Sequence, residues 1–232
     1  MNVAALIPAY QAAPTIGVVI SAFAAEAAQY RQNVPIYVVD DGSTDDTGNQ
    51  AQHAGAQVLR HPKNLGKGAA LMTGFRALER QGFDAAVTLD ADGQHPVEEA
   101  LRLAQSPLPQ DCLILGVRDL AVAGAPTNSQ FSNSLSNYFL SRFVGMQLND
   151  TQCGLRRYPL PQTLGLGLRS PGYALEAEVI LRAARARWSI QQVPVLVIYP
   201  PKEQRISHFH VVRDPARIVW RVLQTWLGGA FQ

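Results

Sequence analysis

Short apolar runs alternate with segments of helical periodicity in the first half of the chain. Most of these runs are apolar throughout, as expected of strands that are covered on both faces. The expected strands cover residues 3–7, 36–39, 57–60, 85–89 and 113–117. Ser43 or Thr44, with Asp46 close behind, is suited to cap one of the intervening helices. The alternation predicts an α/β protein with a mostly parallel central sheet and helices on both faces.

After Arg118 the pattern is less regular. Apolar spacing predicts helices at 130–145, 176–186 and 214–227, and it predicts a strand at 190–199 that Pro194 confines to a sheet edge. Four aromatic residues of the first of these helices are more typical of a core than of a ligand groove: Phe131, Tyr138, Phe139 and Phe143. No linker or internal repeat divides the chain, so we expect a single domain over residues 1–232.

Composition narrows the functional class. Apolar residues make up 47% of the 232 residues, which is enough for a core, and the formal net charge of +2 is too small to indicate a nucleic-acid partner. Cys112 and Cys153 show no metal-ligand spacing, so we expect a reduced, cytoplasmic protein. No basic segment precedes the first apolar run, and no apolar stretch reaches the roughly 18–20 residues of a spanning helix. We therefore expect no signal peptide and no membrane span in this sequence.

Two carboxylates follow the fourth expected strand. Asp90 and Asp92 end the apolar run, and Gly93 and Pro96 then favour a turn and the start of a helix. Ligands of open α/β sheets bind beyond the carboxyl ends of strands, and alternate residues of an extended segment point the same way. Both carboxylates can therefore reach one Mg²⁺ or Mn²⁺ ion that also binds substrate phosphates. The alternative is a solvated Asp-x-Asp turn, which the neighbouring strand and helix signals disfavour.

Other polar residues also follow the expected strands. Asp41 is suited to bind a base or ribose, and equally to stabilise a turn. Lys67, among glycines, could meet a diphosphate or belong to a solvated loop. Arg118, Arg156 and Arg205 would together form an anion pocket, since arginine suits bidentate phosphate contacts. The glycine-rich dinucleotide motif and the P-loop are absent, which disfavours dehydrogenases and P-loop NTPases.

The motifs occur in an order that resembles the family 2 glycosyltransferases, especially the dolichol-phosphate mannose synthase-like branch. The matching segments are residues 3–10, 38–45, 64–68, 89–96 and 150–156. The resemblance implies a GT-A fold with a Rossmann-like nucleotide-binding half over residues 1–118 and an acceptor-binding half over residues 119–232. It also implies a nucleotide-diphosphate sugar donor and a divalent cation, Mg²⁺ or Mn²⁺.

The resemblance also assigns site residues by position. The expected nucleoside contacts are Pro8, Tyr10 and Asp41. Lys67 and the segment Asp90, Ala91, Asp92 and Gln94 resemble the donor site, with Asp90, Asp92 and Gln94 as metal ligands, and the expected phosphate contacts are Arg118 and Arg205. The pattern usually continues after the tyrosine with Asn and Glu, whereas Gln11 and Ala12 follow here. The nucleoside pocket therefore lacks one expected carboxylate.

Together, these expectations predict an inverting glycosyltransferase that moves a hexose to a polyprenyl phosphate. Asp92 is expected to be central to catalysis. A phosphate acceptor needs no strong base, whereas a sugar hydroxyl acceptor would need one, for which Asp150 is the candidate. Transfer to a sugar hydroxyl and a non-catalytic sugar-nucleotide-binding protein are the alternatives. The last expected helix combines an apolar face with a row of arginines, Arg213, Arg217 and Arg221. Such a helix can lie on an anionic membrane or pack in the core, so we expect peripheral association with the inner face of the membrane or an integral membrane partner.

Overall fold

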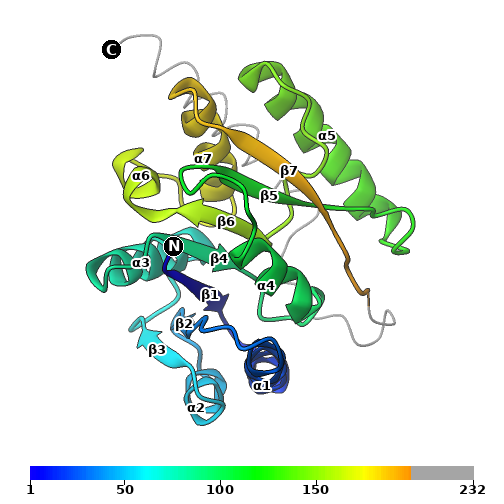
Figure 1. Cartoon of the computed structure of the whole chain (residues 1–232). Coiled ribbons are helices and arrows are strands. Elements are labelled where there is room, and N and C mark those ends of the chain that lie inside the picture. The colour runs from blue at the N-terminus through cyan, green and yellow to red at the C-terminus, as the bar shows by residue number, and fades with distance from the viewer. Residues whose placement is uncertain (200–232) are drawn as a thin grey trace.

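The structure, a computed structural model, describes residues 1–199 and contains one seven-stranded sheet in the order β3-β2-β1-β4-β6-β5-β7 (Figure 1). The strands are β1 (Val3–Ala9), β2 (Ile36–Asp40), β3 (Gln57–Arg60), β4 (Ala85–Thr88), β5 (Leu113–Arg118), β6 (Arg156–Pro159) and β7 (Ile190–Val195). β6 runs antiparallel to both of its neighbours, and the other pairs are parallel. The prediction of a mostly parallel sheet is confirmed, and β7, which contains Pro194, lies at its edge as expected.

Helices cover both faces of the sheet, because successive residues of each buried strand face opposite sides. They are α1 (Ala13–Gln29), α2 (Thr47–His53), α3 (Lys67–Arg80), α4 (Val97–Ala104), α5 (Thr127–Val144), α6 (Leu160–Gly165) and α7 (Ala174–Arg185). In β1, Ile7 packs in one core with residues of α1 and α4, whereas Leu6 packs in the other with residues of α3 and α7. Figure 1 shows α5 beside the β5–β7 end of the sheet.

The sequence did not predict β6, which begins with two arginines. Both are fully buried, because their guanidinium groups donate to backbone carbonyls within the protein. Arg156 donates to Cys153, Thr151 and Glu176, at 2.8 to 2.9 Å. The prediction that Arg156 belongs to an anion pocket is therefore wrong. By returning between β4 and β5, the strand brings the segment before it against the end of β4.

The predicted cap at Ser43 or Thr44 is also wrong. α2 begins at Thr47, with Asp46 at the N-cap position and no side-chain cap hydrogen bond. Ser43 instead accepts a hydrogen bond from the backbone N–H of Gln11, which binds the loop after β2 to the loop after β1. The hydroxyl of Ser43, which the local sequence pattern assigns to a helix cap, thus forms a tertiary contact instead.

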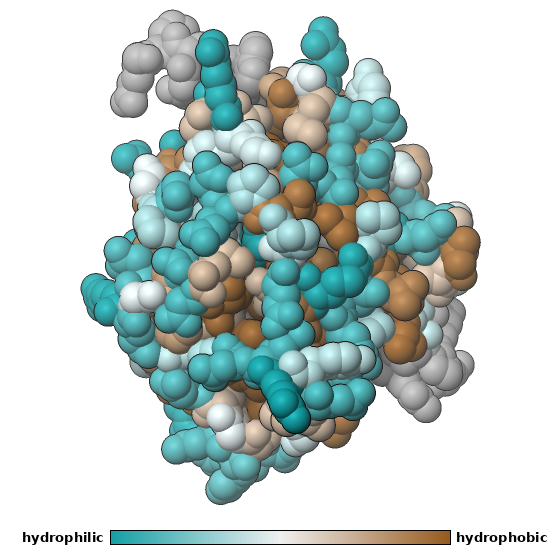
Figure 2. Space-filling model, in the orientation of Figure 1, coloured by the Kyte–Doolittle hydropathy of each residue, from teal (hydrophilic) through white to brown (hydrophobic). Residues whose placement is uncertain are grey.

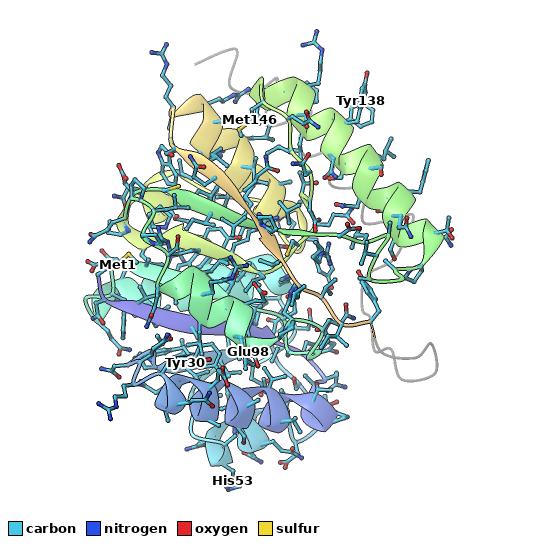
Figure 3. All side chains as sticks on the ribbon, turned by 45° about the vertical axis from the view of Figure 1, so that its right-hand side comes forward. Met1, Tyr30, His53, Glu98, Tyr138 and Met146 are labelled. Atoms are coloured by element: carbon cyan, nitrogen blue, oxygen red, sulfur yellow. The ribbon has the colours of Figure 1, made fainter. Side chains whose placement is uncertain are left out.

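Of the four aromatic residues of α5, Phe143 packs against the core as its spacing predicts, whereas Phe131 and Tyr138 do not. Phe131 is 70% exposed and Tyr138 is 68% exposed, whereas Ser132, Asn133 and Ser136 are buried. In Figure 3, Tyr138 points away from the sheet. Residues 1–199 contain no helix that is long and apolar enough to cross a bilayer. The expected helix at 214–227 lies outside the described residues, as does Arg205.

Candidate active site

The turn that carries Asp90 and Asp92 follows β4, near the centre of the sheet. The backbone N–H of Gln94 donates to Oδ1 of Asp92 at 2.9 Å and closes the turn. Oγ1 of Thr15, in α1, donates to the carbonyl of Ala91 at 2.7 Å and anchors the turn to the neighbouring strand–helix connection. The two carboxylates therefore occupy a fixed turn at the carboxyl end of the sheet, where open α/β sheets bind ligands.

Lys67 is the cation in contact with this turn. Its Nζ lies 2.7 Å from Oδ1 of Asp90 and 3.3 Å from Oε1 of Glu176, at the start of α7. Burial alone would lower the pKa of Lys67, but the charges of Asp90 and Glu176 raise it above its usual value. Burial would likewise raise the pKa of Asp90, and Lys67 brings it below its usual range. Lys67 and Asp90 thus remain charged. No sequence pattern indicates the contact of Glu176 with Lys67, because the two residues are far apart along the chain.

Asp92 differs from Asp90, because within residues 1–199 it forms no ion pair. Burial raises the pKa of Asp92 to about 6, and the negative charge of Asp90 adds to this effect. The described residues contain no cluster of three His, Cys, Asp or Glu side chains that could hold a metal alone. Two carboxylates and the Gln94 carboxamide are a partial set of oxygen ligands, as Mg²⁺ and Mn²⁺ often have when substrate phosphates complete the shell. The donor set therefore fits such a cation.

Gly154 allows Asp90 to occupy its position. A Cβ atom at residue 154 would lie 2.3 Å from Oδ2 and 2.8 Å from Oδ1 of Asp90. Oγ1 of Thr88 donates to the carbonyl of Gly154 at 2.7 Å and fixes the two segments together. The backbone of the segment before β6 thus forms one wall of the acidic site.

Asp41 organises the loop that leads to Lys67. Oδ1 accepts a hydrogen bond from the backbone N–H of Leu65 at 3.0 Å, and Oδ2 accepts one from Gly66 at 2.7 Å. Nδ1 of His61 lies 2.6 Å from Oδ1 of Asp41, and Nε2 of the same ring lies 2.9 Å from Oγ1 of Thr73. The geometry supports the turn-stabilising alternative for Asp41, and its contact with a nucleoside stays a prediction. No sequence pattern marks His61 beyond its position after β3.

The loops after β1 and β2 meet at Gln11, one of the positions where the sequence departs from the family pattern. Its φ of 51° is in the left-handed region. The side-chain carbonyl of Gln11 accepts hydrogen bonds from the backbone N–H groups of Thr44 at 2.9 Å and Asp45 at 3.2 Å. Pro8 pairs with a residue of β2, and Tyr10 follows directly after β1. The expected nucleoside contacts thus lie at two adjacent strand ends.

Arg118 and Asp150 form a buried ion pair. Nε of Arg118 lies 2.7 Å from Oδ2 of Asp150, and Nη2 lies 3.0 Å from Oδ1. The backbone N–H groups of Arg118 and Gln152 also donate to the carboxylate, which is 1% exposed. Asp150 therefore holds Arg118 in place. These hydrogen bonds engage both oxygens of Asp150, which is the arrangement of a positioning residue. The role of Asp150 as a general base stays a prediction.

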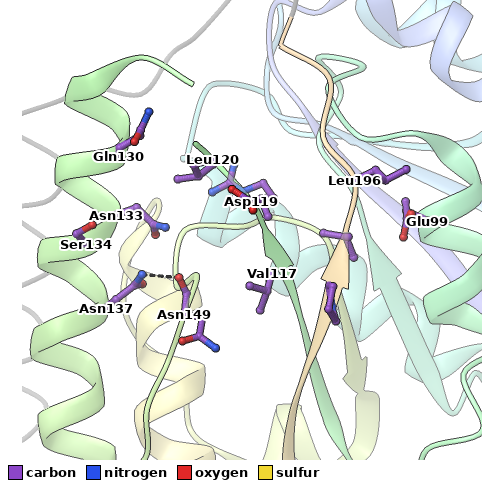
Figure 4. Close-up of a pocket in the computed structure, with 13 residues that line it drawn as sticks. Glu99, Val117, Asp119, Leu120, Gln130, Asn133, Ser134, Asn137, Asn149 and Leu196 are labelled. Atoms are coloured by element: carbon purple, nitrogen blue, oxygen red, sulfur yellow. Dashed lines mark hydrogen bonds between the residues drawn. The ribbon is translucent and has the colours of Figure 1, made fainter. Parts of the chain in front are cut away.

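A cavity of about 670 Å³ opens between α5 and the ends of β5 and β7 (Figure 4). Its lining includes Arg118, Asn133, Asn137, Asn149 and Leu196. The buried Oδ1 of Asn133 has no hydrogen-bond partner among residues 1–199. Ile198, two residues after Leu196, donates its backbone N–H to the carbonyl of Gln94 at 2.7 Å, so this end of the cavity lies beside the acidic turn.

Comparison with known proteins agrees with this geometry. The model of the family "Glycosyl transferase family 2" matches residues 4–155. The undecaprenyl-phosphate mannosyltransferase of Micrococcus luteus is 28% identical over 212 residues, which cover 85% of this chain and 84% of the relative. The polyprenol monophosphomannose synthase of Mycolicibacterium smegmatis is 29% identical over 174 residues, which cover 70% of this chain and 66% of the relative.

A solved structure shows the same architecture. Glucosyl-3-phosphoglycerate synthase from Mycobacterium tuberculosis, in complex with Mn²⁺, UDP and phosphoglyceric acid, superposes with a TM-score of 0.70 at 20% identity. The match covers 98% of this chain and 78% of the other. The expected GT-A fold is thereby confirmed. The family model and the ordered motifs agree, and this chain belongs to glycosyl transferase family 2.

Proposed function

We propose that the protein is an inverting glycosyltransferase that moves a hexose from a nucleotide-diphosphate sugar to a polyprenyl phosphate. The observation that carries the proposal is the acidic turn of Asp90 and Asp92 beside a cavity that contains Arg118. The relatives from Micrococcus luteus and Mycolicibacterium smegmatis, whose names specify undecaprenyl phosphate and polyprenol, support this acceptor class. The intact carboxylate pair disfavours a non-catalytic binding protein.

The donor would lie across the carboxyl ends of β1, β2 and β4. Asp90, Asp92 and Gln94 would hold Mg²⁺ or Mn²⁺, and this cation supplies positive charge to the diphosphate leaving group. Lys67 adds a fixed positive charge beside Asp90, and Glu176 keeps its ammonium group in place. Residues 1–118 would then form the nucleotide-binding half and residues 119–232 the acceptor-binding half.

The acceptor would enter through the cavity beside α5. A phosphate monoester is already a nucleophile at neutral pH, so positioning and charge neutralisation suffice. Arg118, oriented by Asp150, is placed to attract that phosphate, and Arg205 remains a proposed second contact. In this assignment Asp150 orients Arg118 and does not act as a base, which agrees with its hydrogen bonds to Arg118.

One observation favours the alternative acceptor, a sugar hydroxyl. The buried Oδ1 of Asn133 needs a hydrogen-bond donor, which a hydroxyl supplies and a phosphate dianion does not. A panel of nucleotide sugars tested with Mn²⁺ and a short-chain polyprenyl phosphate, followed by mass spectrometry, separates the two. A glycosyl-phosphate lipid is the expected product. Transfer only to soluble sugars would overturn the proposal and make Asp150 the candidate base.

Binding of Mn²⁺ should depend on pH through Asp92. The pKa of this carboxyl is about 6 in the metal-free protein, above its usual 3.8, so a proton competes with the cation below pH 6. The affinity should be constant above about pH 7 and fall by about tenfold per pH unit below about pH 6. Calorimetric Mn²⁺ titrations from about pH 5 to about pH 7.5 test this slope. Asp92→Asn is the control that should remove it. A wild-type affinity that is independent of pH would contradict the assignment.

Gly154→Ala should displace the Asp90 carboxylate. Gly154 does not have a positive φ, so alanine is compatible with its backbone, and the clash with Asp90 is the main effect. Turnover should fall by on the order of 100-fold, the scale of a misplacement of about 1 Å in an active site. Gly165→Ala is the matched control, because a Cβ atom there meets nothing within 4 Å. Equal turnover in both variants would show that the position of Asp90 is not critical.

A further inference from the structure

Much of the outward side of α5 is apolar, although a helix on the surface of a soluble protein usually exposes polar residues. Phe131, Leu135, Tyr138 and Arg142 recur at helical spacing on the outward side, where all four are exposed. We call these four residues the α5 stripe. Figure 2 shows hydrophobic patches along the right-hand edge of the molecule, the side on which α5 lies in Figure 1.

Along the first half of α5 the inward side is polar, with Ser132, Asn133 and Ser136 buried, and towards the C-terminal end Leu140 is buried in the core. Oγ1 of Thr151 donates to Oγ of Ser136 at 2.8 Å, and Nε2 of Gln152 donates to Oγ of Ser132 at 3.0 Å. These hydrogen bonds, together with the packing of Leu140 and Phe143 in the core, fix the orientation of the helix. The rings of Phe131 and Tyr138 consequently face outward.

The charge of α5 complements an anionic surface. Its 18 residues, Thr127–Val144, contain no Asp or Glu and a single basic residue, Arg142, at the end of the stripe. Exposed helices usually carry charges of both signs on their outer side. An apolar stripe with aromatic rings, a terminal arginine and no acidic residue is suited to the boundary between lipid head groups and acyl chains.

The stripe is also continuous with the proposed acceptor cavity. Gln130, Asn133, Ser134 and Asn137, on the adjacent side of the same helix, line that cavity (Figure 4). An acceptor with a polyprenyl chain must keep its tail in the bilayer while its phosphate reaches Arg118. A helix with one side toward the cavity and one side toward lipid allows both.

We propose that the α5 stripe docks on a lipid bilayer and places the cavity at the membrane surface. The biological reason for docking rests on the proposed function. The docking itself depends only on the exposed side chains of the stripe and can be tested separately. It differs from attachment through the arginine row at residues 213–221, because the attraction at the α5 stripe is mainly apolar. The contribution of the stripe should therefore persist when salt screens surface charges.

The test is co-sedimentation of the full chain with vesicles of phosphatidylcholine and phosphatidylglycerol at high salt. Phe131→Ser with Tyr138→Ser should lower the partition coefficient by about tenfold or more, the scale of exposing one large buried apolar side chain. Phe131→Leu with Tyr138→Leu should retain binding. Val18→Ser with Tyr30→Ser is the control, because these side chains of the α1 region are 71% and 60% exposed. Equal partition of the two serine variants would overturn the inference.

A local probe identifies the docked surface. The native cysteines, Cys112 and Cys153, are buried, so a cysteine introduced at Tyr138 or Tyr30 can carry an environment-sensitive fluorophore. Vesicles should shift the emission to the blue at position 138 and leave position 30 unchanged. An unchanged emission at position 138, or self-association through this face without vesicle binding, would exclude docking by α5.

Parallel transfer assays separate this inference from the proposed function. With a short-chain polyprenyl phosphate in detergent, the Phe131 and Tyr138 serine variant should match the wild-type rate, because neither side chain lines the cavity. Failure of transfer with every enzyme form would overturn the proposed function and leave the fluorescence result as the test of docking.

Discussion

Replacing Asp92 with Asn is expected to lower turnover by on the order of 100-fold or more, the scale of losing several kcal/mol of charge stabilisation at the leaving group. The variant is isosteric and keeps an oxygen for the hydrogen bond from Gln94. It also removes the repulsion between Asp90 and Asp92 that helps to raise the pKa of Asp92. The melting temperature should therefore stay unchanged or rise while activity is lost.

Steady-state kinetics with Mn²⁺ and thermal denaturation of the same preparation test this expectation. Loss of both activity and stability would indicate a structural role for Asp92. Full wild-type activity in EDTA would exclude the proposed cation, and unchanged turnover in the variant would remove Asp92 from the site. A conservative control is Asp46→Asn, since Asp46 is an exposed carboxylate at the start of α2.

Replacing Asp150 with Ala is expected to lower the free energy of unfolding by about 3–5 kcal/mol, the cost of breaking a buried ion pair from one side. The carboxylate accepts three hydrogen bonds from Arg118, whose side chain is 12% exposed. The variant leaves that guanidinium group without its counter-charge. Urea denaturation measures the loss, and Arg118→Ala combined with Asp150→Ala should cost less than the sum of the two single changes.

Asp46→Ala is the control, because it removes an exposed carboxylate that pairs with the side chain of Asn49 at the surface. Its effect should stay below about 1 kcal/mol, as for other surface pairs. Asp150→Asn then tests the chemistry at lower structural cost. If Asp150 is a general base, this variant should lose about 100-fold or more in turnover and the acidic limb of the pH profile. If it positions Arg118, the main change should be a higher KM for the acceptor.

Much of the fold was predictable because its local pattern and its tertiary environment agree. β1, β2 and β4 are apolar and buried on both faces, and the helices between them have one apolar side each. The acidic turn was predictable for the same reason, since the chain has to turn where a buried strand ends in two carboxylates and a glycine. Its position at the carboxyl edge follows from parallel topology.

Other features depend on atoms that are distant in sequence. β6 has no apolar signal, because its two arginines are stabilised by backbone carbonyls that only the folded chain brings near. The packing of Gly154 against Asp90 spans more than sixty positions and leaves no local pattern. The contacts of Glu176 with Lys67 and of His61 with Asp41 also join separate segments and leave no local pattern.

The sequence by itself determined the fold class and the positions of the first five expected strands along the chain. It also determined that Asp90 and Asp92 follow the end of a strand. Periodicity and composition suffice for these, because burial and backbone geometry act on neighbouring residues. Only the tertiary structure decided that, within residues 1–199, Asp90 is paired with Lys67 while Asp92 is not, and that Asp150 is held by Arg118. It also decided that α5 buries Ser132, Asn133 and Ser136 and exposes Phe131 and Tyr138. Here long-range hydrogen bonds to Thr151 and Gln152 override the hydrophobic preference of a single helix.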